Sequence, residues 1–109
     1  MIVRTLKPQD AASFAALRLA GLQECPEAFA SSYEEEAHTP LSEIEVRLQP
    51  NAERAVIGAF EQLVLLGVVG VQRESMKKLS HKAFLWGMYV APSARGRGVG
   101  AQVLSAALE

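Results

Sequence analysis

The 109-residue sequence is poor in the features that often define a protein class directly. It has one cysteine, Cys25, so no disulfide can form within the chain, which fits a reducing compartment. The two histidines, His38 and His81, have no motif around them. Nowhere do His, Cys, Asp and Glu cluster with the spacing of metal ligands, so we predict no metal site.

The chain also lacks an excess of charge and a long apolar run. Its formal net charge of −1 argues against a general role on nucleic acid or on a membrane surface, because phosphate affinity requires surplus Lys and Arg. The apolar runs fall far short of the ~20 residues of a transmembrane helix, and the N-terminus has no signal-peptide core. We expect a cytoplasmic protein with no nucleic-acid or membrane partner.

What remains is a composition typical of a folded domain. Half of the residues are hydrophobic and 21% are charged, so the chain can bury a core. The length suits one domain, and no repeat, linker or low-complexity segment interrupts it. We therefore predict a single domain over residues 1–109.

Apolar spacing in the first half predicts one strand and two helices. Ile2–Leu6 alternates and is a short strand, and Gln9–Leu22 has its large apolar residues at helical spacing. Thr39 followed by Pro40 is typical of a helix start, with Thr as the cap. Glu34–Glu36 is either a solvated acidic face or an attractor for a cationic substrate.

The second half predicts a sheet. Arg54–Phe60 and Leu63–Val71 are apolar runs separated by a polar pair, which indicates a hairpin, and 72–82 reads as a loop. A third strand follows around Leu85, and it is apolar on both faces, which favours a central position. The predicted fold class is α+β, with a mainly antiparallel central sheet flanked by helices.

The stretch 84–104 carries the chemistry. An apolar strand leads into a proline-led turn with two arginines and three glycines, and a helical pattern follows. A helix start offers unpaired N–H groups and a partial positive charge, so this arrangement suits a phosphate. Residues 96–101 match G-x-G-x-x-G/A, but a dinucleotide fingerprint needs a βαβ unit and a later acid, which are missing. Two interpretations of this turn therefore remain: an exposed loop whose glycines merely permit the turn, and a pyrophosphate site of another kind.

The segment Val90-Ala91-Pro92-x-x-Arg95-Gly96-x-Gly98-x-Gly100 resembles the acetyl-CoA-binding motif R/Q-x-x-G-x-G/A of the GCN5-related N-acetyltransferase (GNAT) family. Arg95, Gly98 and Gly100 occupy the defining places of that motif. The upstream order of strand, two helices and three strands is also similar to the family. The resemblance implies the acyl-CoA N-acyltransferase fold and acetyl transfer from acetyl-CoA to a primary amine.

The resemblance also implies roles for particular residues. The strand backbone should pair with the pantetheine arm, and the N–H groups of the turn and helix start should hold the pyrophosphate. Gly87 is either the bulge that this family often has, aiming an N–H at the thioester oxygen, or a packing position under Trp86 or Tyr89. The cofactor-binding residues are Met88, Tyr89, Val90, Arg95, Gly96, Arg97, Gly98, Val99, Gly100 and Ala101.

The acceptor side is less defined. In the family, the segment joining the first two helices borders the acceptor pocket, so Phe29, Ser31 and Tyr33 are candidate contacts for a small-molecule or protein amine. An ordinary loop with one anchoring aromatic residue is the alternative. Residues 81–91 contain no carboxylate. We therefore assign no catalytic residue.

The family normally continues beyond the phosphate-binding helix, whereas this chain stops at Glu109 in an apolar-periodic run. We expect a domain that is incomplete at its C-terminus, with little or no acetyl transfer. The last strand would then be an exposed edge, open to homodimer pairing. The alternative function is a non-catalytic acyl-CoA-binding or interaction module.

Overall fold

A computed structural model describes residues 1–29, 32–51, 53–73 and 83–108. Its four strands form one sheet in the order β1-β2-β3-β4, and every neighbouring pair is antiparallel. The strands are β1 Ile2–Thr5, β2 Arg54–Glu61, β3 Val64–Arg73 and β4 Ala83–Val90. The predicted hairpin and third strand are confirmed, and residues 74–82 of the predicted loop lie outside the described residues.

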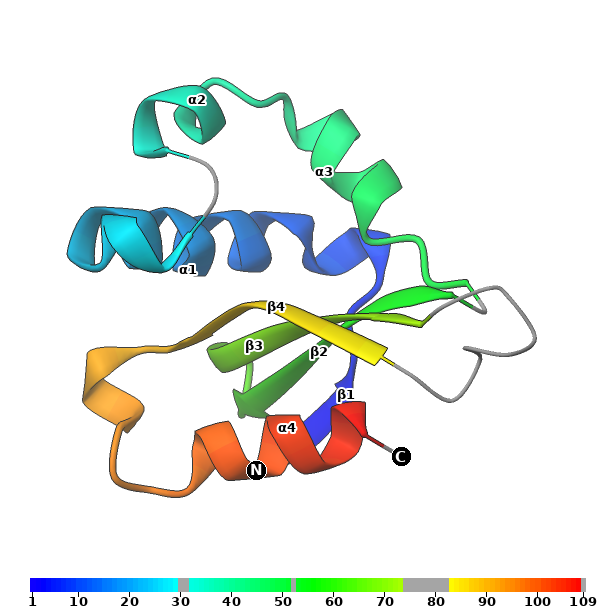
Figure 1. Ribbon diagram of the computed structural model, residues 1–109, viewed down its shortest axis with the longest axis vertical. Coiled ribbons are helices and arrows are strands. Elements are labelled where there is room, and N and C mark those ends of the chain that lie inside the picture. The colour runs from blue at the N-terminus through cyan, green and yellow to red at the C-terminus, as the bar shows by residue number, and fades with distance from the viewer. Residues whose placement is uncertain (30–31, 52, 74–82, 109) are drawn as a thin grey trace.

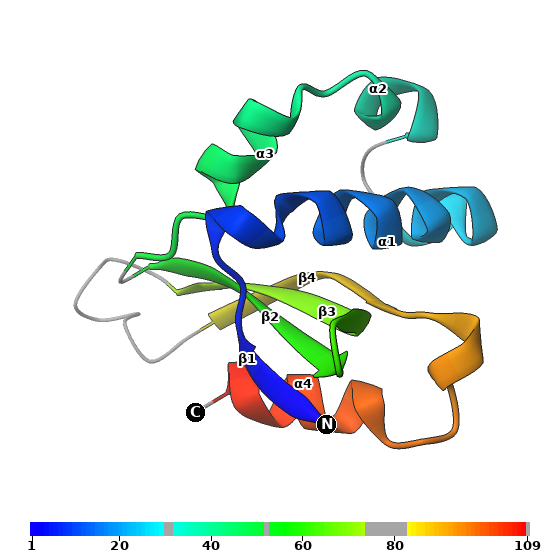
Figure 2. The same ribbon diagram turned by 180° about the vertical axis from the view of Figure 1, so that it is seen from behind.

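Helices cover both faces of this sheet. Helices α1, α2 and α3 lie on one face, and α4 lies on the other (Figure 1). Figure 2 shows β1 at one edge of the sheet, leading directly into α1. The helices are α1 Ala11–Glu24, α2 Tyr33–Ala37, α3 Leu41–Arg47 and α4 Val99–Ala107. This is the predicted α+β arrangement, and no described helix combines the length and apolarity that crossing a bilayer requires.

The two faces of the sheet bury separate cores. On the α1 side, Phe14 and Leu17 pack with Ile44 of α3 and with Leu6 and Val68. On the α4 side, the helix inserts apolar side chains against β2 and β3, namely Val99, Val103 and Ala107. The sheet therefore fixes α1 and α4 on opposite sides of β4.

An ion pair ties β1 to the start of α1. The Asp10 carboxylate accepts hydrogen bonds from both terminal nitrogens of Arg4, at 2.8 and 2.9 Å, and from the Lys7 N–H at 2.8 Å. The Asp10 side chain is only 9% exposed. The hydrogen bonds from Arg4 lower the pKa of this carboxyl, against the effect of burial.

One sequence prediction about local structure was wrong, and one helix was not predicted. Thr39 is not the helix cap: Pro40 is the N-cap, in an extended conformation, and α3 begins at Leu41. The acidic run was not predicted to be helical, yet it lies in α2, where Ser32 caps the helix by accepting the Glu35 N–H at 3.2 Å.

The third predicted strand, β4, is not central in the described sheet but lies at its edge. Four of its large apolar side chains are exposed to solvent, namely those of Phe84, Leu85, Trp86 and Met88. A strand that is apolar on both faces is expected to be covered by neighbouring elements. The described residues cover β4 along only one edge and over part of each face.

Candidate active site

A β-bulge interrupts β4 at Gly87. Tyr89 pairs with Val68 and Trp86 pairs with Gly70. Between these two pairs β4 therefore contains one more residue than β3. Gly87 has φ of +61°, a conformation that favours glycine. The bulge itself is confirmed, whereas the role of its N–H toward a thioester oxygen stays a prediction. Apart from its two neighbours in the chain, the one described group within 4 Å of a Cβ placed on Gly87 is Nη1 of Arg18, at 2.8 Å.

After β4, a short 3₁₀ turn at Pro92–Ala94 leads through the arginine-glycine segment into α4. Gly98 is the N-cap of α4, in the left-handed conformation with φ of +78°. Val99 is 1% exposed and anchors the first turn in the core. A Cβ on Gly100 would lie 3.1 Å from the Met88 side chain, so the motif's last glycine lets α4 approach β4 closely.

The N–H groups of residues 96–101 have no acceptor in the part of the chain that the structure describes, and the helix ladder begins with the Gln102 N–H donating to the Gly98 carbonyl at 3.1 Å. These groups are exposed or half-buried at the start of a nine-residue helix, apart from buried Val99. Such an array suits an anion. The Arg95 N–H differs, because it donates to the Pro92 carbonyl at 3.3 Å.

The side chain of Arg95 is held by a carboxylate that the sequence analysis did not predict. Glu24, at the end of α1, accepts from Nη1 of Arg95 at 3.2 Å, from its Nη2, and from the Tyr89 hydroxyl at 2.8 Å. The guanidinium lies 5.5 Å from the centre of the Tyr89 ring. Its Nε donates to the Val90 carbonyl at 3.1 Å, so one backbone group expected to pair with pantetheine already has a partner.

These contacts set the charge states of the cluster. Hydrogen bonds from Arg95 and then Tyr89 lower the pKa of Glu24. Burial, followed by the hydrogen bond to Glu24, raises the pKa of Tyr89. The hydrogen bonds thus favour the anionic form of Glu24, and the cluster ties the turn to the end of α1.

Arg97 points to a different partner. Its Nη2 forms an ion pair with Glu61 of β2, and both side chains are about half exposed. Because exposed ion pairs contribute little, Arg97 can exchange this partner for a phosphate at small cost. Arg97 therefore adds positive charge beside the helix start without being fixed there.

The candidate acceptor residues separate in space. The Phe29 ring packs against Tyr89, with 6.5 Å between the ring centres, and against the Arg18 guanidinium at 5.3 Å. Tyr33 instead lines a cavity beside Leu22 and Pro26. Ser31 lies outside the described residues. Phe29 thus lies beside Tyr89 and Arg18, close to the bulge in β4, whereas Tyr33 lines a separate cavity.

The acidic run contributes to the same region as Phe29. Glu36 binds Arg18 through two hydrogen bonds, at 2.5 Å to Nε and 2.9 Å to Nη2. Both side chains are largely buried, at 13% and 17% exposure. Glu36 therefore does not belong to a solvated face, while Glu34 and Glu35 are exposed. No local pattern in the sequence marked Arg18 as its partner.

Comparison with known proteins agrees with this geometry. A model of the acetyltransferase (GNAT) family matches residues 21–109. The chain therefore belongs to the GNAT acetyltransferase family. A comparison with curated proteins finds no match.

Solved structures show the same fold at low sequence identity. A GNAT-family acetyltransferase from Streptococcus pneumoniae matches with a TM-score of 0.75 and 21% identity, over 97% of this chain and 64% of that one. PaiA N-acetyltransferase from Thermoplasma acidophilum, in complex with coenzyme A, matches with a TM-score of 0.74 and 20% identity, over 97% and 68%.

A third structure is the ribosomal-protein-alanine N-acetyltransferase of Brucella melitensis, with a TM-score of 0.68 and 18% identity, over 99% of this chain and 65% of that one. This chain thus spans less than two thirds of the length of the S. pneumoniae and B. melitensis proteins. The shared fold places β4, the turn and α4 in a known architecture.

Proposed function

We propose that this protein transfers an acetyl group from acetyl-CoA to a primary amine. The chain supplies the acetyl-CoA site along β4, the turn 95–98 and the start of α4. The observation that carries the proposal is the row of N–H groups at 96–101 without an acceptor among the described residues, which follows the bulged strand after the short turn at Pro92–Ala94. Such a row at a helix start is suited to a pyrophosphate.

Each part of the site has a separate task. The N–H groups and the α4 dipole bind the phosphates, while the ion pair of Glu24 with Arg95 holds the turn against α1. The bulge at Gly87 changes the direction of the β4 backbone, where an N–H can stabilise charge on a thioester oxygen. Orientation of the two reactants is then the chain's main contribution to the reaction.

Titration calorimetry tests the cosubstrate site. We expect both acetyl-CoA and CoA to bind, because the pyrophosphate is common to them. Arg97→Ala should weaken binding by no more than about fivefold, as expected when an exposed charge is lost. Arg54→Ala is the matched control, because it makes the same charge change at an exposed position away from the turn, and it should leave the affinity unchanged.

Absence of binding for both ligands would overturn the proposed site. Binding with slow but detectable acetylation of a primary amine would support the proposed transfer, whereas binding with no detectable acetylation would support the alternative of a non-catalytic acyl-CoA-binding module. In residues 83–91 we still find no carboxylate, and we expect the 109-residue chain alone to show little or no acetyl transfer. Rapid acetylation of a range of primary amines by this chain would contradict that expectation.

We also propose that the chain by itself forms a homodimer through β4. In the described part of the sheet β4 is an edge strand, and four of its large apolar side chains are exposed, including Phe84 and Leu85. Such an edge is prone to pair with another strand. Sedimentation velocity should show a dimer, and Leu85→Lys should shift it toward monomer, whereas Leu63→Lys, at an exposed residue in the β2–β3 turn, should not. A monomer at all concentrations would refute this pairing.

A further inference from the structure

Arg18 of α1 lies directly over the β4 bulge. Its guanidinium is 5.3 Å from the centre of the Phe29 ring and 5.9 Å from that of Trp86, and its Nη1 would lie 2.8 Å from a Cβ placed on Gly87. Glu36 occupies Nε and Nη2. The remaining nitrogen, Nη1, has no acceptor within the described ranges. A hydrogen-bond donor is therefore available beside the bulge, next to the proposed cosubstrate site.

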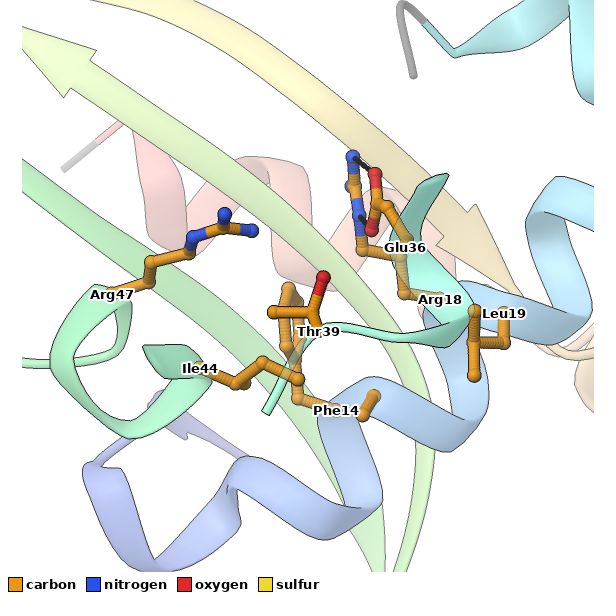
Figure 3. Close-up of a pocket in the computed structure, with 8 residues that line it drawn as sticks. Phe14, Arg18, Leu19, Glu36, Thr39, Ile44 and Arg47 are labelled. Carbon is orange, nitrogen blue, oxygen red and sulfur yellow. Dashed lines mark hydrogen bonds and ion pairs between the residues drawn. The ribbon is translucent and has the colours of Figure 1, made fainter. Parts of the chain in front are cut away.

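A second guanidinium reaches the same place from α3. Two cavities share Phe14, Arg18 and Arg47 in their linings, one among α1, α2 and α3 and the other between α1, α3 and the sheet, and we call them together the arginine pocket. Figure 3 shows the Arg47 side chain extending over this pocket, opposite the pair of Arg18 and Glu36. Arg47 bonds Glu43 through Nη2 only, at 2.9 Å, in an exposed contact.

The charges that line the arginine pocket do not cancel. Its described lining contains two guanidinium groups and one carboxylate, that of Glu36. Glu43, the partner of Arg47, lines neither cavity, and because both side chains of this pair are about half exposed, water screens the pair and Glu43 offsets only part of the Arg47 charge. The walls are otherwise mostly apolar, with Phe14 and Leu48 buried and Trp86 closing one side. A net positive charge beside apolar walls favours an anion more than it would in open water.

We propose that the arginine pocket binds a carboxylate of the acceptor, so that the acceptors are primary amines that also carry a carboxylate. This inference rests on the proposed acetyl transfer. Guanidinium groups match the planar carboxylate with paired hydrogen bonds. With the carboxylate beside Arg18 and Arg47, the amine end of the same molecule faces the bulge at Gly87. A second ammonium group in that place would be repelled.

The size of the pocket agrees with a small anionic group. The cavity beneath Trp86 has a volume of about 70 Å³. That is room for a few water-sized groups, and hence for a carboxylate with its adjoining carbon. A bulky ring would have to remain outside this cavity.

The test compares three amines of one chain length, namely 5-aminopentanoate, pentylamine and 1,5-diaminopentane. The chain contains a single tryptophan, Trp86, so its indole NMR signal reports on the pocket. We expect 5-aminopentanoate to bind about tenfold more tightly than pentylamine, as a charge-assisted hydrogen bond allows. The diamine should bind more weakly than pentylamine. Equal affinity of all three would overturn the inference.

Variants assign the effect to the pocket. Arg47→Gln should reduce the preference for 5-aminopentanoate over pentylamine to about twofold or less. Arg54→Gln, the matched change at an exposed position outside the pocket, should preserve the preference. An undiminished preference in Arg47→Gln, with its circular dichroism unchanged, would contradict the assignment.

The two proposals fail in different ways. If CoA binds but the carboxylate preference is absent, the acetyl-CoA site stands and the arginine pocket does not. If CoA does not bind, the Trp86 titration still measures the pocket directly, because that readout needs no cosubstrate.

Discussion

Gly98→Val is expected to reduce the affinity for acetyl-CoA by about a hundredfold or more, because it combines backbone strain with the loss of aligned donors. Gly98 is the N-cap of α4 with φ of +78°, which a β-branched residue does not readily adopt. Relief of that strain rotates the peptide units that carry the N–H groups of Val99 and Gly100. Calorimetry with acetyl-CoA measures the loss.

The control for this variant is Gln102→Val. It introduces the same side chain at an exposed position of α4, after the first turn, where φ is helical and the N–H is already bonded. Its affinity should stay within about twofold of the unaltered chain. Near-normal binding by Gly98→Val would show that the turn does not hold the phosphates. A Cβ at Gly98 meets no atom within 4 Å, so core disruption does not explain a loss.

This turn is the part of the site that sequence reasoning can reach, because its determinants are local. Gly96 and Gly98 both have positive φ, and α4 begins at Val99, one residue after the last turn glycine. For Gly87 the sequence allowed either a bulge or a packing position, and only the register between β3 and β4 distinguishes them. Backbone conformation, in short, depends on neighbours along the chain and leaves a pattern there.

Side chains that meet across the fold leave no such pattern. Glu24 and Arg95 are 71 residues apart, and Arg18 and Glu36 are 18 apart, on different elements in each case. Their encounter depends on how α1 lies on the sheet, which no spacing rule specifies. Residues 83–90 of β4 contain no carboxylate, but α1 brings Glu24 to Tyr89 of that strand, and α2 brings Glu36 to Arg18, which lies beside the bulge.

The position of α1 links the start of the chain to the site. Its first turn is tied to β1 by Arg4 and Asp10, and its last residue, Glu24, binds Tyr89 and Arg95. Between these ends, Arg18 reaches the bulge. A helix fixed at both ends therefore carries one residue to the phosphate turn and another to the proposed acceptor pocket.

Asp10→Asn is expected to lower the free energy of unfolding by about 2 kcal/mol at neutral pH, since it removes charge-assisted bonds from a nearly buried group. The amide keeps the shape of the side chain but is uncharged, and its NH₂ group replaces one of the two oxygens that accept hydrogen bonds from Arg4. Denaturant unfolding provides the measurement. Glu43→Gln is the control, because it breaks the exposed pair with Arg47 and should cost no more than about 0.5 kcal/mol.

The pH dependence makes the role of Asp10 specific. Because its folded-state pKa lies below the ordinary carboxyl value, its stabilisation is fully present above that ordinary value. It is lost as the pH falls through the lowered pKa, where the folded protein also takes up the proton. The stability difference between the unaltered chain and Asp10→Asn should therefore shrink in acid. A difference that stays constant from neutral to strongly acidic pH would mean that the Arg4 pair does not anchor α1.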